Sequence, residues 1–200
     1  MSRPIKGEAR SAILEAADRL FYRDGIRAVG VDLVAAEAGI TKRTLYYHFP
    51  TKEALIDAYL SQRDQPTRDR LIEQAERFGP LPGDHILGIF DVFADWFVDS
   101  DWRGCPYLNA MAESGSKADA VCERVTEHKE ALSRWITVTL AEAGAKDPQG
   151  LAEQLMLLID GALSRSAYRG SEVARHARAT AAALLSLSGV AISQPIGNLQ

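Results

Sequence analysis

Residues 41–48 combine cationic, hydroxyl and aromatic side chains in a pattern that suits hydrogen bonding to nucleic acid. The segment reads Thr-Lys-Arg-Thr-Leu-Tyr-Tyr-His. Lysine and arginine neutralise phosphates, and an arginine fork can donate two hydrogen bonds to the edge of a guanine. Leu45 and Phe49 are four residues apart, so in a helix they share an inner face and leave the polar side chains on or near the outer faces. The segment therefore predicts a short helix that presents hydrogen-bond donors to DNA.

A second short helix and a glycine turn precede this segment. The apolar residues before the turn repeat at helical spacing: Val31, Val34, Ala35 and Ala38. Gly39 then allows a left-handed turn of the backbone, and Thr41 can cap the next helix by accepting a backbone N–H. Two short helices joined in this way form a helix-turn-helix, whose second helix enters the major groove of DNA. We therefore expect residues 31–49 to touch DNA.

Eight side chains are candidates for DNA contacts in this arrangement. The candidates for base edges are Lys42, Arg43, Thr44 and Tyr46. The candidates for phosphates are Tyr47, His48 and Lys52, and Thr41 completes the set as the residue that opens the helix. Pro50 ends the helix, so Lys52 lies in the first turn of the next one, where backbone amides can hold a phosphate. Other interpretations stay open, because Tyr47 can pack as a core aromatic, and His48 and Lys42 can be ordinary solvated residues.

The distribution of charge along the chain supports this interpretation weakly. The formal net charge is −4, which is unusual for a protein that binds nucleic acid. Residues 1–52, however, contain nine Lys and Arg against six Asp and Glu, a formal charge of +3, and the remainder carries −7. A basic N-terminal part attracts phosphates, and an acidic remainder repels them.

Helical periodicity and chain breakers predict an all-α chain of about nine helices. The expected helices span residues 5–24, 32–38, 42–48, 52–78, 84–99, 106–115, 117–143, 148–168 and 171–189. We expect a three-helix DNA-binding head over residues 1–52 and a helical body over residues 53–200. Pro66 lies inside the fourth helix pattern, so either a helix end or a bend is expected near Gln65.

The stretch from Gly39 to Leu55 (GITKRTLYYHFPTKEAL) resembles the signature of the tetracycline-repressor (TetR) family of transcriptional regulators. The similarity extends back through residues 12–25 and 34–39 and covers about the first quarter of the chain. In one respect this sequence departs from the family, which usually opens the second helix with Thr or Ser. Val29 and Gly30 occupy that place here, so the usual hydroxyl contact to a phosphate is in doubt. Glycine can still act as a weaker cap.

The resemblance implies a ligand-responsive repressor that binds a near-palindromic double-stranded operator as a homodimer. A small-molecule inducer, which the sequence does not identify, would release it. The family usually encloses its inducer between the middle helices, and the candidate residues there are Phe93, Trp96, Phe97, Leu108, Asn109, Met111, Ala112, His128, Trp135 and Asp160. The segment from Arg103 to Asn109, followed by Glu113, resembles a pattern in one branch of the family.

Several of these candidates also fit a purely structural role. An aromatic stripe at helical spacing is typical of a protein core as well as of a pocket. Asp160 lies in an apolar helix and needs a partner if it is buried, which Arg134 or Arg165 could supply. Asn109 can satisfy a backbone group, and His128 can be a core histidine.

The last two helices are expected to form the dimer interface. Helix 148–168 is apolar on nearly all sides, and helix 171–189 is rich in alanine. An apolar helix must be covered on both sides, and small residues let helices approach closely. The simplest explanation is a four-helix interface between two subunits, and the alternative is a bundle within one chain.

The sequence contains no signature of catalysis or of metal binding. None of the four histidines has a His or Cys at helical ligand spacing, and catalytic or nucleotide-binding motifs are absent. We therefore expect no enzyme, no cofactor and no metal, and a metal site assembled from distant residues stays open as the alternative. The two cysteines, the absence of a secretory leader and the absence of a long apolar run favour a cytoplasmic protein without a membrane span. The alternatives are a ligand-independent regulator or activator and, more remotely, an all-helical enzyme or scaffold.

Overall fold

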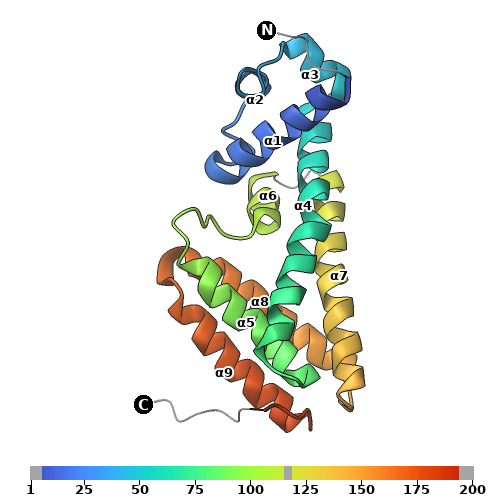
Figure 1. The fold of residues 1–200 in the computed structure, drawn as a ribbon, viewed down its shortest axis with the longest axis vertical. Coiled ribbons are helices and arrows are strands. Elements are labelled where there is room, and N and C mark those ends of the chain that lie inside the picture. The colour runs from blue at the N-terminus through green and yellow to red at the C-terminus, as the bar shows by residue number, and fades with distance from the viewer. Residues whose placement is uncertain (1–5, 115–118, 194–200) are drawn as a thin grey trace. The chain divides into compact units, whose positions relative to one another are not determined.

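The computed structural model describes residues 6–114 and 119–193, and every regular element in those residues is helical (Figure 1). The helices are α1 (Lys6–Asp24), α2 (Val31–Glu37), α3 (Lys42–His48), α4 (Lys52–Ala75), α5 (Pro82–Phe97), α6 (Pro106–Ser114), α7 (Asp119–Glu142), α8 (Pro148–Arg169) and α9 (Glu172–Leu187). A 3₁₀ turn, η1 (Glu76–Phe78), follows α4. The prediction of an all-α chain of about nine helices is confirmed.

Helices α4 and α5 differ from the prediction at their proline residues. Helix α4 continues through Pro66 as far as Ala75, so the expectation of a helix end near Gln65 is wrong, and the bend stays a prediction. Helix α5 begins at Pro82, ahead of the expected start at residue 84. Proline is tolerated there because the first turn of a helix needs no backbone N–H donor.

The described chain divides into two compact units, and neither unit is one continuous stretch of sequence. The first contains residues 1–65 and 105–127, and the second contains residues 66–104 and 128–200. The first unit therefore holds α1, α2, α3 and α6 with the beginnings of α4 and α7. The expected division into residues 1–52 and 53–200 stays a prediction.

The apolar stripe of α1 is the centre of the first unit. Its members are all buried: Ile13, Ala16, Ala17, Leu20 and Phe21. The ring of Phe21 packs edge-on against Tyr59 of α4, with 5.5 Å between the ring centroids. Arg63 of α4 lies 4.5 Å over the ring of Tyr22 and forms a 3.0 Å ion pair with Asp18. Helices α1 and α4 thus provide a fixed base for the two short helices α2 and α3, which pack on α1.

Helix α5 is the centre of the second unit, where it packs against α9 and α8. Its large apolar side chains, such as Ile86, Phe90 and Phe93, are buried. Gly88 permits a close approach to the end of α4, because a Cβ atom at this position would lie 2.3 Å from the carbonyl oxygen of Ala75.

Asp84 joins the start of α5 to the segment that follows α9. Its carboxylate accepts hydrogen bonds from the backbone N–H of Ser193 (2.8 Å), the hydroxyl of Ser193 (2.6 Å) and the backbone N–H of Leu81 (3.1 Å). Burial alone would raise the pKa of Asp84, but these hydrogen bonds outweigh it and hold the pKa below its usual 3.8. The ionised carboxylate therefore stabilises the fold.

Replacing Asp84 by alanine is expected to lower the free energy of unfolding at pH 7 by about 2–3 kcal/mol, measured by urea denaturation. Because the pKa is lower in the folded chain, this stabilisation is present above the unfolded value of 3.8 and is lost as the pH falls through the folded value. The control, Asp95→Ala, removes an exposed carboxylate from the same helix and should change stability by less than about 0.5 kcal/mol. Equal losses in the two variants would contradict the prediction.

Candidate nucleic-acid interface

Helices α2 and α3 form a helix-turn-helix around a left-handed glycine. Gly39 has φ +66°, and the backbone N–H of Ile40 closes the turn by donating to the carbonyl of Ala35 at 3.0 Å. Thr41 caps α3 as expected, since its hydroxyl oxygen accepts the backbone N–H of Thr44 at 3.2 Å. The inner faces of both helices are buried, including Leu45. The spacing of the apolar residues in the sequence thus sets which face of α3 points outward.

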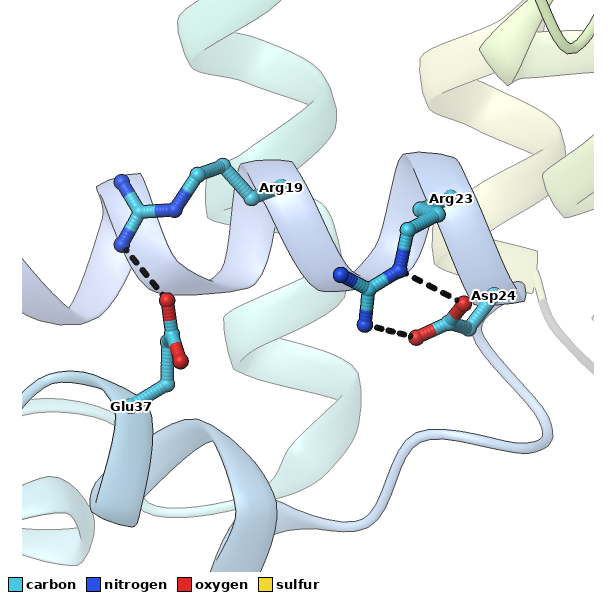
Figure 2. A network of polar contacts seen from close by, with 4 residues as sticks. All are labelled: Arg19, Arg23, Asp24 and Glu37. Atoms are coloured by element: carbon cyan, nitrogen blue, oxygen red, sulfur yellow. Dashed lines mark hydrogen bonds and ion pairs between the residues drawn. The ribbon is translucent and has the colours of Figure 1, made fainter. Parts of the chain in front are cut away.

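An ion pair attaches the end of α2 to α1. The guanidinium of Arg19 donates to the carboxylate of Glu37 at 3.1 Å, while Arg23 pairs with its neighbour Asp24 within α1 (Figure 2). Both members of the Arg19–Glu37 pair are exposed, so the pair contributes little to overall stability. The packing of α2 on α1 therefore rests mainly on buried apolar side chains such as Val34.

The outer face of α3 carries the expected polar and aromatic side chains. Arg43 and Tyr46 are exposed, and Tyr47 is 67% exposed. The interpretation of Tyr47 as a core aromatic is therefore wrong. Its ring meets the half-buried His48 edge-on, with 5.2 Å between the ring centroids.

The start of α4 lies directly after α3 in the chain and carries Lys52 as its first residue. The hydroxyl of Thr51 accepts the backbone N–H of Ala54 at 3.1 Å and so caps this helix. Lys52 is half-buried. The arrangement is suited to holding a phosphate, because the early backbone amides of a helix and a lysine offer donors together.

Lys42 has a partner that the sequence did not indicate. Its ammonium group lies 2.9 Å from the carboxylate of Asp32, in the first turn of α2, and the side chains are 52% and 73% exposed. The hydrogen bond and the charge of Asp32 raise the pKa of Lys42. In the free protein, Lys42 is thus engaged on the same surface that carries Arg43 and Tyr46.

Comparison with known proteins identifies this arrangement. Residues 13–59 match the family model of bacterial regulatory proteins of the tetR family, and residues 82–182 match the tetracyclin repressor-like C-terminal domain. The chain belongs to the TetR family. TetR-family members are transcriptional regulators that bind DNA through a helix-turn-helix, so the chain is a DNA-binding regulator and not an enzyme.

Individual TetR-family proteins are similar over most of the chain. A TetR-family regulator from Streptomyces coelicolor is 32% identical with a TM-score of 0.81, and the match covers 91% of this chain and 96% of that one. A structure from Streptomyces avermitilis is 30% identical with a TM-score of 0.83, covering 92% and 99%. The transcriptional regulator TtgR of Pseudomonas putida is 28% identical over 172 residues, which are 79% of this chain and 80% of TtgR.

The departure from the TetR family at Val29 and Gly30 has a structural counterpart. Gly30 is the residue that precedes α2, its backbone is extended, and no side-chain hydrogen bond caps the helix. Val29 is buried and cannot substitute for the missing hydroxyl. In this TetR-family chain, the start of α2 can therefore offer only backbone donors to a phosphate.

The three aromatic candidates for a ligand site in α5 form one cluster with a tryptophan that we did not predict. Phe93 stacks on Phe97 with 5.6 Å between the centroids and lies 5.9 Å from Trp96. Trp102 completes the cluster, 5.1 Å from Phe97, and its indole N–H donates to the hydroxyl of Ser166 at 3.0 Å. Phe93 and Phe97 are buried, whereas Trp96 is half-buried.

The remaining ligand candidates fall into different units. The first unit contains Leu108, Asn109, Met111 and Ala112, and the second contains His128, Trp135 and Asp160. Of these, Met111 and Ala112 are exposed, and the others are half-buried. The role of all of them in ligand binding stays a prediction.

The prediction that Asp160 pairs with an arginine is wrong. Its carboxylate forms a 2.5 Å ion pair with Lys129 of α7, while Arg134 pairs with Glu130. Lys129 and Asp160 are 31 residues apart in the chain. The two residues lie on different helices, α7 and α8, so local spacing carried no signal for this pair.

None of the helices in residues 6–114 and 119–193 is long and apolar enough to cross a membrane. Nor do three or more His, Cys, Asp or Glu side chains gather as a metal site anywhere in that part of the chain.

Replacing Asp32 by asparagine is expected to strengthen binding to random DNA about threefold to tenfold, because the change removes a negative charge beside α3 and frees Lys42 for phosphates. Titration of labelled random duplexes at two salt concentrations measures the effect. The matched control is Glu37→Gln, which removes the same charge from the other end of α2, where it pairs with Arg19. An unchanged or weaker affinity of Asp32→Asn would contradict the prediction.

Proposed function

We propose that this TetR-family regulator is a cytoplasmic, homodimeric repressor that binds a near-palindromic operator and is released by a small molecule. Its two α3 helices would enter successive major grooves of the operator. Lys42, Arg43, Thr44 and Tyr46 would meet base edges in this arrangement. Tyr47, His48, Lys52 and the start of α3 at Thr41 would meet phosphates.

The observation that carries the DNA-binding part is the outward face of α3. Arg43, Tyr46 and Tyr47 are exposed on a helix whose inner side is anchored by the fully buried Leu45. Side chains of this kind on a fixed short helix are suited to recognition of base edges and phosphates.

Support for the homodimer comes from the outer face of α8 and α9. Leu157 is 75% exposed on α8, and Leu187 is 86% exposed on α9. A groove of about 310 Å³ runs between the two helices and is lined in part by Leu158, Gly161 and Ala177. A second copy of the same face would cover these apolar groups in a symmetric four-helix interface.

Support for a small-molecule ligand comes from the second unit. A cavity of about 400 Å³ opens beside Trp96 and is lined by the side chains of Arg70, Gln74, Phe78 and Val92, among others. This volume lies within the range of sites that bind small molecules. The adjacent aromatic cluster would report binding through tryptophan fluorescence. Repression rather than activation rests on the family resemblance alone.

The test is selection of bound duplexes from a random DNA pool with the full chain, repeated in the presence of a library of small molecules. A palindromic motif is the expected result, and ligand-sensitive release of the selected DNA is expected for the proposed mechanism. A motif that no ligand releases would support the ligand-independent alternative. Failure to enrich any sequence would contradict operator binding.

A further inference from the structure

Helix α6 is attached to the DNA-binding helices by a carboxylate near its end. The backbone N–H of Arg27, in the turn between α1 and α2, donates to Glu113 of α6 at 2.8 Å. These two residues are 86 positions apart in the sequence. A hydrogen bond from a backbone N–H to an ionised carboxylate is stronger than one between neutral groups. Because the donor is a backbone N–H, Glu113 restrains the main chain of the turn and not only a mobile side chain.

The turn is shaped to receive this carboxylate. Gly25 has φ +89°, and a Cβ atom at its position would lie 2.8 Å from both carboxylate oxygens of Glu113. A side chain at residue 25 would therefore collide with Glu113 as well as strain the backbone. The backbone N–H of Val29 closes the turn by donating to the carbonyl of Gly25 at 3.3 Å. Helix α2 begins two residues later, at Val31.

A second anchor holds the other end of α6 in place. The hydroxyl of Tyr107 donates to the backbone carbonyl of Leu60 in α4 at 2.9 Å. Tyr107 is fully buried, and burial raises the pKa of its hydroxyl far above the usual range, so the group remains a donor. The start of α7 also contacts α4, because Arg124 of α7 pairs with Asp57 of α4 at 2.9 Å. With Tyr107 fixed on α4, Glu113 is held at a constant position relative to α1.

We propose that Glu113 is a positioning residue for DNA binding, which holds the α1–α2 turn so that α2 and α3 keep the arrangement that fits the operator. The inference rests on the proposed operator binding. It also assigns a role to the segment from Arg103 to Glu113, which the sequence had singled out. Tyr107 attaches this segment to α4, and Glu113 attaches it to the turn before α2. A movement of α6 would act on the α1–α2 turn through this carboxylate.

The test compares Glu113→Ala and Glu113→Gln in the full chain. We expect Glu113→Ala to bind the selected operator about tenfold more weakly, and Glu113→Gln, which keeps an acceptor oxygen, to recover most of that loss. The control is Glu123→Ala, which removes an exposed carboxylate from the part of α7 in the same unit and should leave operator affinity unchanged. Thermal unfolding of each variant separates a loss of affinity from a loss of folded protein.

A spectroscopic measurement distinguishes positioning from general support. Hydrogen exchange at the Arg27 amide, followed by NMR, should be slow in the wild type, faster in Glu113→Ala and again slow in Glu113→Gln, while the other amides of the unit keep their rates. A merely structural role would instead speed exchange across the whole unit, lower the melting temperature and show no recovery by glutamine. Unchanged operator affinity in Glu113→Ala, beside a wild type that binds, would overturn this inference alone. Absence of binding by the wild type would overturn the proposed function as well.

Discussion

Replacing Leu157 by arginine is expected to convert the protein into a monomer and to weaken operator binding by about 100-fold or more. Leu157 is 75% exposed on α8, so the monomer fold does not depend on it. In the proposed dimer, however, it lies on the face covered by the second copy, and two arginines facing each other across a symmetry axis would repel. Because two linked heads bind one operator cooperatively, loss of the dimer removes most of the affinity.

Analytical ultracentrifugation at micromolar concentration measures the first effect, and titration of the selected operator measures the second. The matched control is Val138→Arg, which places the same charge at an exposed apolar position of α7. We expect this control to remain dimeric and to bind DNA as the wild type does. A Leu157→Arg variant that sediments as a dimer would show that the interface lies elsewhere.

The second large effect is expected for Arg43→Ala. Arg43 is exposed on the outer face of α3, so its loss should leave the melting temperature unchanged. Loss of a bidentate contact to a guanine removes about 1–3 kcal/mol of binding free energy, a factor of about 5 to 150 in affinity. The preference for one base pair in each half of the operator should also disappear.

Lys52→Ala serves as the matched comparison for Arg43→Ala. A phosphate contact carries no sequence information, so this variant should bind all sequences more weakly. The slope of log affinity against log salt concentration should become shallower by about one. Repeating the DNA selection with both variants separates the two roles. If Arg43→Ala selected the same motif with the same affinity, the assignment of Arg43 to a base edge would be wrong.

Features that depend on neighbouring residues could be predicted from the sequence. The apolar stripe of α1, the glycine turn before α3 and the cap at Thr41 all follow from residue types within a few positions of one another. The exposed position of Arg43 follows from the same spacing, because Leu45 must point inward. The family signature lies in this local part of the chain for the same reason.

Contacts between distant residues could not be predicted in this way. The ion pair of Lys129 with Asp160 and the hydrogen bond of Arg27 to Glu113 depend on how whole helices pack. Spacing shows which face of a helix is polar, but it does not show which partner lies opposite. The course of α4 through Pro66 is a similar case, since the surrounding packing decides whether a proline ends a helix or is accommodated in it.

The first unit consists of two separate stretches of sequence, and this limits which fragments of the regulator can be excised or exchanged. The chain passes from one unit to the other after residues 65, 104 and 127. A DNA-binding head excised near residue 52, or exchanged there with the head of a relative, would not include Leu60, Tyr107 or Glu113. It would therefore lose the hydrogen bond of Glu113 to the turn before α2. A transferable DNA-binding module that keeps these contacts therefore needs residues from both stretches of sequence.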